Sequence, residues 1–421
     1  MEPLTIARLK ALTPPSCETE FFDDRIELID YNTETDLVAL TCEFYTARRV
    51  YYIASRFRER NIPTVIGGYH ATLCPEEVAR NSDSIVLGNA ETVWEQILED
   101  YRSGSMRKIY RGEPVFKNFS VDRSIYGRKK YSALRTLEIG RGCFHNCKFC
   151  AISTFYKGKY YRKPIERVVK DIKNSDGKFF FFSDDNIIAD QQYASELFQA
   201  ITPLKIRWSG QGSLAMAGNP KLLKLMKKSG CDVILIGYES LDQDNLKQMN
   251  KSWIGKLGKV DELTRRIHQA GLNIYATFVF GFDCDTEELV DRTLKFALKH
   301  RFFFAAFNHL LPIPGTPLHK RLKEEKRLIN EEWWLSPDYR YGDFVIRSVG
   351  ITPEKLSEKC LAARSQFYSL PAILKRSMVL LIRKPHPLLF LYFWQINLNL
   401  QKEVSGKNGL PIGEGLDELP K

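Results

Sequence analysis

Short apolar runs and amphipathic segments alternate along the first 112 residues. Between the apolar runs, apolar residues recur every three or four positions and predict helices, one at 3–12, one ending near Ala54 and one starting at Pro75. The apolar runs predict β-strands at 25–30, 37–42, 64–68 and 84–88. Strands that alternate with helices are typical of a parallel, doubly wound sheet. We therefore expect residues 1–112 to form an α/β lobe.

A second alternating region follows residues 113–134, a charged stretch that lacks periodic apolar positions and is predicted to be a linker. Each strand-like run in this region ends in polar or glycine residues, as a ligand-binding rim requires. Six such runs are predicted, at 136–139, 178–182, 206–208, 232–236, 273–280 and 304–311. The chain therefore contains a second α/β unit, over residues 135–320.

Composition narrows the class of protein. With 421 residues, 44% of them hydrophobic, the chain can bury a large core in two or three domains. Nine cysteines without a recognisable secretory leader favour the reducing cytoplasm. The net charge of +11 is spread along the chain, so we expect no nucleic acid partner. The longest apolar region, 378–400, is interrupted by charged residues and prolines and is not expected to span a membrane.

Three cysteines, Cys143, Cys147 and Cys150, follow the first strand of the second unit within eight residues. Three thiolates on one loop can hold three irons of a [4Fe-4S] cube and leave the fourth iron open for a substrate. A closed zinc site takes four ligands, usually as two separated pairs, and no second pair with suitable spacing follows. A zinc knuckle or chance thiols remain the alternative.

The spacing CxxxCxΦC, with Phe149 at the Φ position, resembles the signature of the radical S-adenosylmethionine (radical SAM) superfamily. The resemblance implies a partial (β/α)6 barrel over 135–320, a [4Fe-4S] cluster on Cys143, Cys147 and Cys150, and S-adenosylmethionine bound at the open iron. Reductive cleavage would then produce a 5'-deoxyadenosyl radical. Phe149 would pack beside the cluster and the adenine.

Residues after the barrel strands acquire roles from the same resemblance. Those after the second strand would contact the methionyl ammonium or cap the next helix. Glu239, after the fourth strand, would bind the ribose hydroxyls or the ammonium, and its alternative is a salt-bridged rim carboxylate. Gly281 would permit close approach of the adenine, and Leu311 would close the barrel beside it. The complete set of cofactor-binding candidates is Phe149, Ser183, Asp184, Asp185, Gln211, Ser213, Glu239, Gly281 and Leu311.

The amino-terminal lobe resembles the cobalamin-binding domain that precedes the barrel in one branch of this superfamily. The similarity rests on the run from Gly67 to Glu77, which reads GGYHATLCPEE. Two features differ from the pattern: no strand precedes the helix at 3–12, and there is no Asp-x-His-x-x-Gly motif. We therefore expect a truncated lobe that binds cobalamin weakly or not at all.

The favoured function is that of a radical SAM enzyme acting on an unactivated carbon of a lipid, tetrapyrrole or secondary-metabolite substrate, with electrons from a flavodoxin- or ferredoxin-type donor. One alternative is a cobalamin-dependent radical SAM methyltransferase. Another is a methylthiotransferase-like RNA-modifying enzyme, with a second cluster on Cys17, Cys42 and Cys74. A non-catalytic iron–sulfur protein is the third.

The carboxy-terminal part, 321–401, resembles a mainly helical extension that covers the open side of the barrel and helps form the substrate pocket. Its apolar segment 388–394 is flanked by Arg376, Arg383 and Lys384, a pattern that suits contact with a membrane surface or equally a core helix. Residues 402–421, rich in glycine and charge, are predicted to be disordered.

Overall fold

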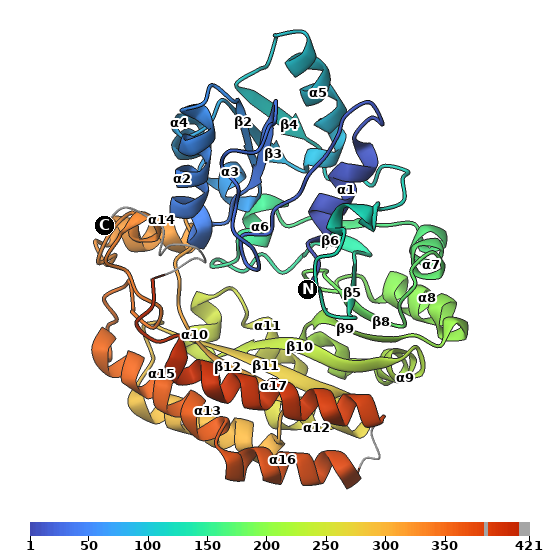
Figure 1. The fold of residues 1–421 in the computed structure, drawn as a ribbon. Coiled ribbons are helices and arrows are strands. Elements are labelled where there is room, and N and C mark those ends of the chain that lie inside the picture. The colour runs from blue at the N-terminus through green and yellow to red at the C-terminus, as the bar shows by residue number, and fades with distance from the viewer. Residues whose placement is uncertain (383–385, 412–421) are drawn as a thin grey trace.

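The computed structural model describes residues 1–382 and 386–411 and places the amino-terminal lobe above the second α/β unit (Figure 1). The lobe contains a four-stranded parallel sheet of order β1-β2-β3-β4. Its strands are β1 (Val38–Thr41), β2 (Thr64–Gly67), β3 (Ser84–Gly88) and β4 (Ile109–Gly112). The helices around it are α1 (Leu4–Leu12), η1 (Phe44–Thr46), α2 (Ala47–Arg58), α3 (Tyr69–Leu73), α4 (Pro75–Arg80), η2 (Ala90–Thr92) and α5 (Trp94–Arg102).

The strand predicted at 25–30 is absent, so that prediction was wrong. The Asp23 carbonyl accepts hydrogen bonds from the backbone N–H groups of Ile26 and Glu27, which form a turn instead. Ile26 and Leu28 are exposed, and Ile29 alone of the apolar residues in this segment packs, partly buried, against Ile53, Phe57 and Ile62. β1, which has β2 as its paired neighbour, is therefore an edge strand. β4, in contrast, was not predicted.

The six-stranded parallel sheet predicted for the second unit is confirmed, with the order β12-β11-β10-β9-β8-β5. Its strands are β5 (Arg135–Leu137), β8 (Phe179–Phe182), β9 (Arg207–Gly212), β10 (Cys231–Glu239), β11 (Asn273–Phe280) and β12 (Phe304–His309). Around it lie η3 (Arg123–Tyr126), α7 (Ile165–Lys173), α8 (Gln191–Ile201), η4 (Thr202–Leu204), η5 (Leu214–Gly218), α9 (Pro220–Lys228), α10 (Gln243–Gln248), α11 (Trp253–Leu257), α12 (Val260–Gln269) and α13 (Glu287–His300).

This sheet does not close into a full barrel, and side chains satisfy the backbone of its two edge strands. On β12, the Tyr368 hydroxyl accepts from the Ala305 N–H at 3.2 Å and lies 2.8 Å from the Ala305 carbonyl, to which it donates. On β5, the Thr136 N–H donates to Glu2 Oε1 at 3.1 Å, and Arg123 donates to the Thr136 carbonyl. Unpaired edges expose backbone groups that would otherwise pair with another chain. These side chains therefore take the place of missing strands.

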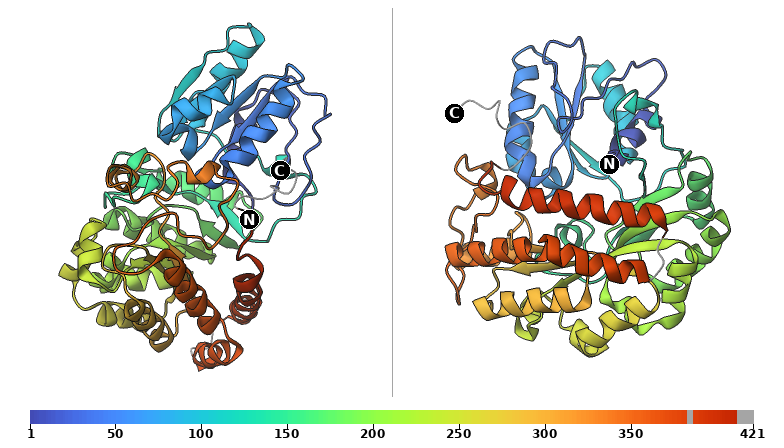
Figure 2. Two further views of the ribbon diagram at one scale, coloured as in Figure 1. Left: turned by 90° about the vertical axis from the view of Figure 1, so that its left-hand side faces the viewer. Right: turned by 60° about the horizontal axis from the view of Figure 1, so that its bottom comes forward.

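Helix α15 (Pro353–Phe367) packs against β12, and α16 (Leu370–Ile382) and α17 (Pro387–Gly406) lie side by side (Figure 2). Two shorter elements lie elsewhere: α14 (Pro317–Glu324) has its Leu318 N–H bonded to the Lys148 carbonyl, and η6 (Trp333–Leu335) contacts α2 of the lobe. α17 thus extends into the segment predicted to be disordered from residue 402, whose end, 412–421, lies outside the described residues. Within the described ranges, no helix is long and apolar enough to cross a bilayer.

Candidate functional site

Cys143, Cys147 and Cys150 lie on one loop at the carboxyl edge of the six-stranded sheet, between β6 (Gly140–Gly142) and α6 (Ala151–Phe155). The antiparallel pairing of β6 with β7 (Tyr160–Arg162) fixes the start of this cysteine loop, residues 143–150. Among the described residues, its three thiols do not converge within 4.8 Å as the ligands of a single ion do. A wider spacing suits a cube, because each thiolate binds a different iron.

Burial raises the pKa of the Cys147 thiol to about 12, although the positive charge of Lys251 opposes the shift. Burial also raises the pKa of Cys150. Buried thiolates need a neighbouring cation, and a bound metal supplies one because it deprotonates its ligands. The donor set and its surroundings therefore fit an iron–sulfur cluster.

Asp184 and Asp185 hold the backbone that leads into the cysteine loop. Asp184 is buried and accepts the Ile139 N–H at 3.1 Å and the Gly140 N–H, while Asp185 accepts the Gly142 N–H at 3.0 Å. Burial and the nearby Glu138 raise the pKa of Asp184, and burial raises the pKa of Asp185 to about 6. These contacts also end β5 at Leu137, two residues before the predicted end of that strand.

Asn186, which follows this pair, donates to Cys143 Sγ at 3.5 Å. The strand-end segment predicted to contact S-adenosylmethionine therefore also positions one of the cysteines. The contact with the methionyl ammonium itself stays a prediction.

Glu239 ends β10 with a positive φ of 61° and forms a buried ion pair with Lys251, Oε1 to Nζ at 2.6 Å. Burial works against the Lys251 charge, but the Glu239 carboxylate outweighs it and raises the Lys251 pKa. Lys251 Nζ also lies 5.8 Å from the centre of the Phe149 ring, within the cysteine loop. The rim salt bridge considered for Glu239 is thus present, and it is beside the cysteines.

Phe149 meets Phe282 edge-to-face, with ring centroids 6.4 Å apart. Buried Asp285 fixes this end of β11, because its carboxylate accepts the N–H groups of Gly281 at 2.6 Å and Phe282 at 2.8 Å. Gly281 has a φ of 130°, and a side chain there would lie 2.9 Å from Leu310 Cβ. Leu311 packs partly buried against the main core. Phe149 thus lies beside the turn that contains Gly281, and the contact of these residues with the adenine stays a prediction.

The remaining candidates also lie at this edge, after β8 and in or after β9. The Ser183 hydroxyl donates to the Leu137 carbonyl at 3.0 Å, and the Gln211 carbonyl accepts the Ile187 N–H at 2.8 Å. The Ser213 hydroxyl is buried and has no partner among the described residues. An orphaned hydroxyl at the rim is a group that a bound ligand would satisfy.

Two functional-site residues were not predicted from the sequence, Lys251 and Trp253. The Trp253 ring stacks on His145 of the cysteine loop at 4.2 Å and 9°. Both residues follow α10. No sequence pattern relates them to the cysteine loop, which lies about a hundred positions earlier in the chain. Their proximity to the cysteines arises from the tertiary fold.

Ion pairs join the lobe to the segment that leads into the cysteine loop. Arg141, two residues before Cys143, pairs with Glu91 of the lobe at 2.6 Å and with Glu138 at 3.1 Å. Arg8 of α1 pairs with the same two carboxylates. In addition, Tyr69 of α3 and Phe155 of α6 are in edge-to-face contact at 4.8 Å. The carboxyl ends of the lobe strands therefore face the cysteine loop.

His70, Cys74 and Glu77 form the one group of metal-capable side chains that converges among the described residues. Glu77 is already engaged: it accepts from Tyr51 at 2.6 Å, from Trp334 at 3.1 Å, and lies 2.9 Å from His70 Nε2. We interpret this group as a hydrogen-bonding centre that joins the lobe to η6. Cys17 lies elsewhere, against Arg102, so the second-cluster hypothesis for Cys17, Cys42 and Cys74 has no geometric support.

The lobe offers buried polar atoms that a cobalamin could engage. His70 is its only histidine, and its Nε2 is taken by Glu77. Asn89 Oδ1 and His70 Nδ1, after β3 and β2, are buried and without a partner in the described structure. Such atoms fit a ligand rich in amide groups.

Comparisons with known proteins agree with this geometry. The Radical SAM superfamily profile matches residues 137–297, which include all three loop cysteines. The chain is 29% identical over 389 residues to the bacteriochlorophyllide d C-12(1)-methyltransferase of Chlorobaculum tepidum, covering 89% of this chain and 84% of that protein. It is 28% identical to the C-8(2)-methyltransferase of the same organism, covering 89% and 87%.

Solved structures show the same fold. OxsB, a cobalamin-dependent S-adenosylmethionine radical enzyme, superposes with a TM-score of 0.59 and 15% identity over 89% of this chain and 64% of its own. The radical S-adenosylmethionine methyltransferase TsrM from Kitasatospora setae superposes with a TM-score of 0.58 and 14% identity, over 78% and 74%. The chain thus spans about two thirds to three quarters of the length of these two structures.

Proposed function

We propose that the chain is a radical SAM enzyme that transfers a methyl group to an unactivated carbon of a tetrapyrrole-type substrate. Two relatives named as bacteriochlorophyllide methyltransferases match 89% of the chain, which includes both the lobe and the barrel. The structural observation that carries the proposal is the Arg141–Glu91 ion pair, which joins the lobe to β6, the strand that leads into the cysteine loop. A methyl carrier held by the lobe would therefore adjoin the site of radical formation.

The residues of the site have different roles in this chemistry. Cys143, Cys147 and Cys150 would hold three irons of a [4Fe-4S] cluster, which supplies an electron to S-adenosylmethionine when both are bound. Glu239 and Lys251 place a buried carboxylate and ammonium beside the loop, where they can bind the charged ends of the methionyl group. Phe149 and Phe282 form an aromatic wall that excludes water from the radical.

We propose that the lobe holds cobalamin as the methyl carrier, in place of the expectation from sequence that it binds weakly or not at all. The unpartnered Asn89 Oδ1 and His70 Nδ1 support this, since both are buried at the carboxyl ends of lobe strands. Cobalamin supplies a cobalt centre that accepts and donates methyl groups.

The same proposal predicts the cellular compartment and the partners of the enzyme. All nine cysteines are free thiols, which suits a cytoplasmic enzyme with an oxygen-sensitive cluster. We propose a flavodoxin- or ferredoxin-type electron donor, a tetrapyrrole or similarly apolar substrate, and peripheral contact with a membrane. The surface that supports membrane contact is described below.

The test is anaerobic turnover of a bacteriochlorophyllide with S-adenosylmethionine whose sulfonium methyl group is CD3. The reaction is run with and without hydroxocobalamin. We expect substrate that carries one CD3 group, formed only with cobalamin. Cys147→Ala should abolish both the cluster absorbance and the product. Cys284→Ala, which alters an exposed cysteine, serves as the control and should leave both intact.

Two results would contradict the proposal. If 5'-deoxyadenosine forms and the substrate is changed without gaining CD3, the reaction is hydrogen abstraction followed by oxidation, cyclisation or rearrangement. If CD3 transfer occurs equally without cobalamin, the lobe is not the carrier site.

A further inference from the structure

Helix α16 turns an apolar face outward. Leu370, Leu374, Met378 and Leu381 recur at intervals of four, four and three residues, so they share one face of the helix, and all are more than half exposed. The opposite face, which contains Ile373, Arg376, Ser377 and Leu380, is buried. A surface helix normally has the reverse arrangement, with its polar side outward.

The first turns of α17 extend this surface. Leu388, Leu391 and Tyr392 are exposed, and α17 packs side by side with α16 (Figure 2). We call the exposed residues of the two helices the apolar face; their exposures run from 42% for Tyr392 to 78% for Ile382. The face comprises Leu370, Leu374, Met378, Leu381, Ile382, Leu388, Leu391 and Tyr392. Soluble monomers seldom gather so many exposed apolar side chains on neighbouring elements.

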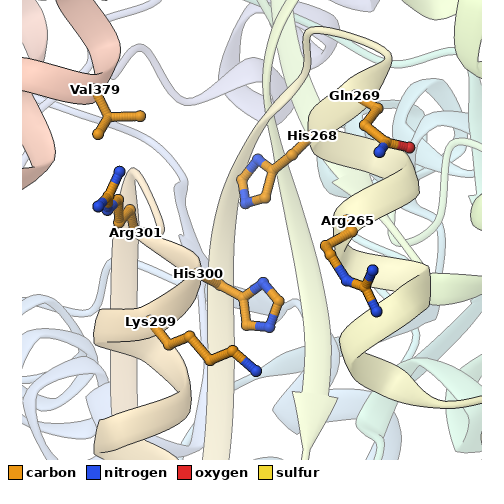
Figure 3. A pocket seen from close by; sticks show the side chains of 7 residues that line it. All are labelled: Arg265, His268, Gln269, Lys299, His300, Arg301 and Val379. Carbon is orange, nitrogen blue, oxygen red and sulfur yellow. The ribbon is translucent and has the colours of Figure 1, made fainter.

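A cationic pocket of about 290 Å³ adjoins this face (Figure 3). Arg265 and His268 of α12 line one side, Lys299, His300 and Arg301 at the end of α13 line another, and Val379 of α16 closes it. Val379 lies three residues before Ile382 of the apolar face, a spacing at which two residues are neighbours on a helix surface. The pocket therefore adjoins the margin of the apolar face.

The pocket keeps an excess of positive charge. Asp261 pairs with Arg265 at 3.1 Å, with Lys299 at 2.6 Å and with His300 at 2.9 Å. One carboxylate thus faces three permanent cations, since Arg301 also lines the pocket. Lys375 adds a further exposed cation at the margin of the α16 face. An anionic group of phosphate size is the ligand that such a pocket attracts.

We propose that this side of the protein docks on an anionic lipid bilayer. The apolar face enters the interface between headgroups and acyl chains, and the cationic pocket binds a lipid phosphate. The net charge of +11 also favours binding of the protein to an anionic membrane surface. A second copy of the chain suits it less well, because an isologous dimer would bring the two cationic pockets toward each other.

The geometry also orients the enzyme. Gln269 and Arg301 precede β11 and β12, so the pocket lies at the amino ends of the strands, whereas the cysteine loop lies at their carboxyl ends. Docking therefore leaves the catalytic edge facing away from the bilayer. Variants of the docking surface consequently leave the catalytic machinery unchanged.

The proposal is tested by sedimentation of the purified full-length protein with vesicles of phosphatidylcholine alone or with about 30% phosphatidylglycerol. We expect binding to the anionic vesicles that weakens as salt rises. The variant Leu374→Ser/Met378→Ser/Leu381→Ser should lower the partition coefficient at least about tenfold. Its matched control, Ile26→Ser/Leu28→Ser/Val349→Ser, alters three exposed apolar residues elsewhere and should bind as the wild type does.

A second pair of variants tests the charges. Lys299→Gln/Arg301→Gln should weaken binding by about fivefold for each charge removed, whereas Lys221→Gln/Lys224→Gln on α9 should not. Equal binding to both kinds of vesicle, no binding at all, or full binding by the triple variant at 374, 378 and 381 would overturn the proposal. A dimer in sedimentation velocity that this triple variant dissociates would overturn it too, and would assign the face to a second copy.

Discussion

At the scale of single residues, the Glu239–Lys251 pair most affects how the site is interpreted. A strand-end carboxylate was expected to bind S-adenosylmethionine directly, and the structure gives it a buried ammonium partner at 2.6 Å. Both groups lie beside the cysteine loop, so the pair presents opposite charges where a zwitterionic methionyl group would bind. Removal of one charge leaves the other buried and unpaired, which is costly.

We predict that Glu239→Gln lowers the affinity for S-adenosylmethionine roughly ten- to hundredfold, because a charge-assisted hydrogen bond is worth about 1.5–3 kcal/mol. Iron content should remain at the wild-type value, since Glu239 is not a metal ligand in this site. Equilibrium binding to the reconstituted protein measures the effect. Glu262→Gln, at an exposed carboxylate paired with Arg266, is the control. An unchanged affinity for Glu239→Gln would leave the residue a structural ion pair.

At the scale of elements, the open sheet depends on side chains that complete its edge strands. The Tyr368 hydroxyl both accepts from and donates to the Ala305 backbone in β12, and Arg364 donates to the Phe307 carbonyl at 2.9 Å. The segment from α15 to Tyr368 therefore covers the barrel and also supplies hydrogen-bond partners to its edge strand, β12.

We predict that Tyr368→Phe lowers the free energy of unfolding by about 1–3 kcal/mol, because a buried backbone N–H and carbonyl lose their partner. Urea denaturation of the anaerobic protein measures this. Tyr392→Phe, in which the hydroxyl lost belongs to an exposed tyrosine, should change stability by less than about 0.5 kcal/mol. Equal effects of the two changes would argue against the edge-capping role.

At the scale of the whole molecule, three buried charged residues and the partly buried Glu138 join the lobe to the barrel. Arg8 and Arg141 share Glu91 and Glu138, so α1, η2 and the β5–β6 turn are joined directly above the cysteine loop. The lobe and the segment before the cysteine loop therefore share one cluster of ion pairs.

We predict that Glu91→Gln destabilises the protein by about 3–5 kcal/mol, since it leaves two buried guanidinium groups with one carboxylate fewer. Glu95→Gln, which removes an exposed partner of Lys117, should cost less than about 1 kcal/mol. Chemical denaturation compares them. If both variants unfold at the same denaturant concentration, the ion pairs between lobe and loop do not stabilise the fold.

The sequence by itself determined the two α/β units, the six strands of the barrel sheet and the cysteine loop. Each of these depends on local patterns: apolar runs, helical spacing, and three thiols within eight residues. A local pattern of this kind indicates which positions are buried or bind metal. It does so whichever distant residues these positions contact in the fold.

Only the tertiary structure decided the rest. The run at 25–30 is apolar enough for a strand, yet it forms a turn because a strand also needs a neighbour with which to exchange hydrogen bonds. Lys251 reaches Glu239, and Asp184 the N–H groups of residues 139 and 140, because distant segments approach in register. The outward apolar face of α16 likewise became visible only once its neighbours were placed. Contacts between distant residues depend on how helices and strands pack together, and the local spacing of apolar residues does not specify that packing.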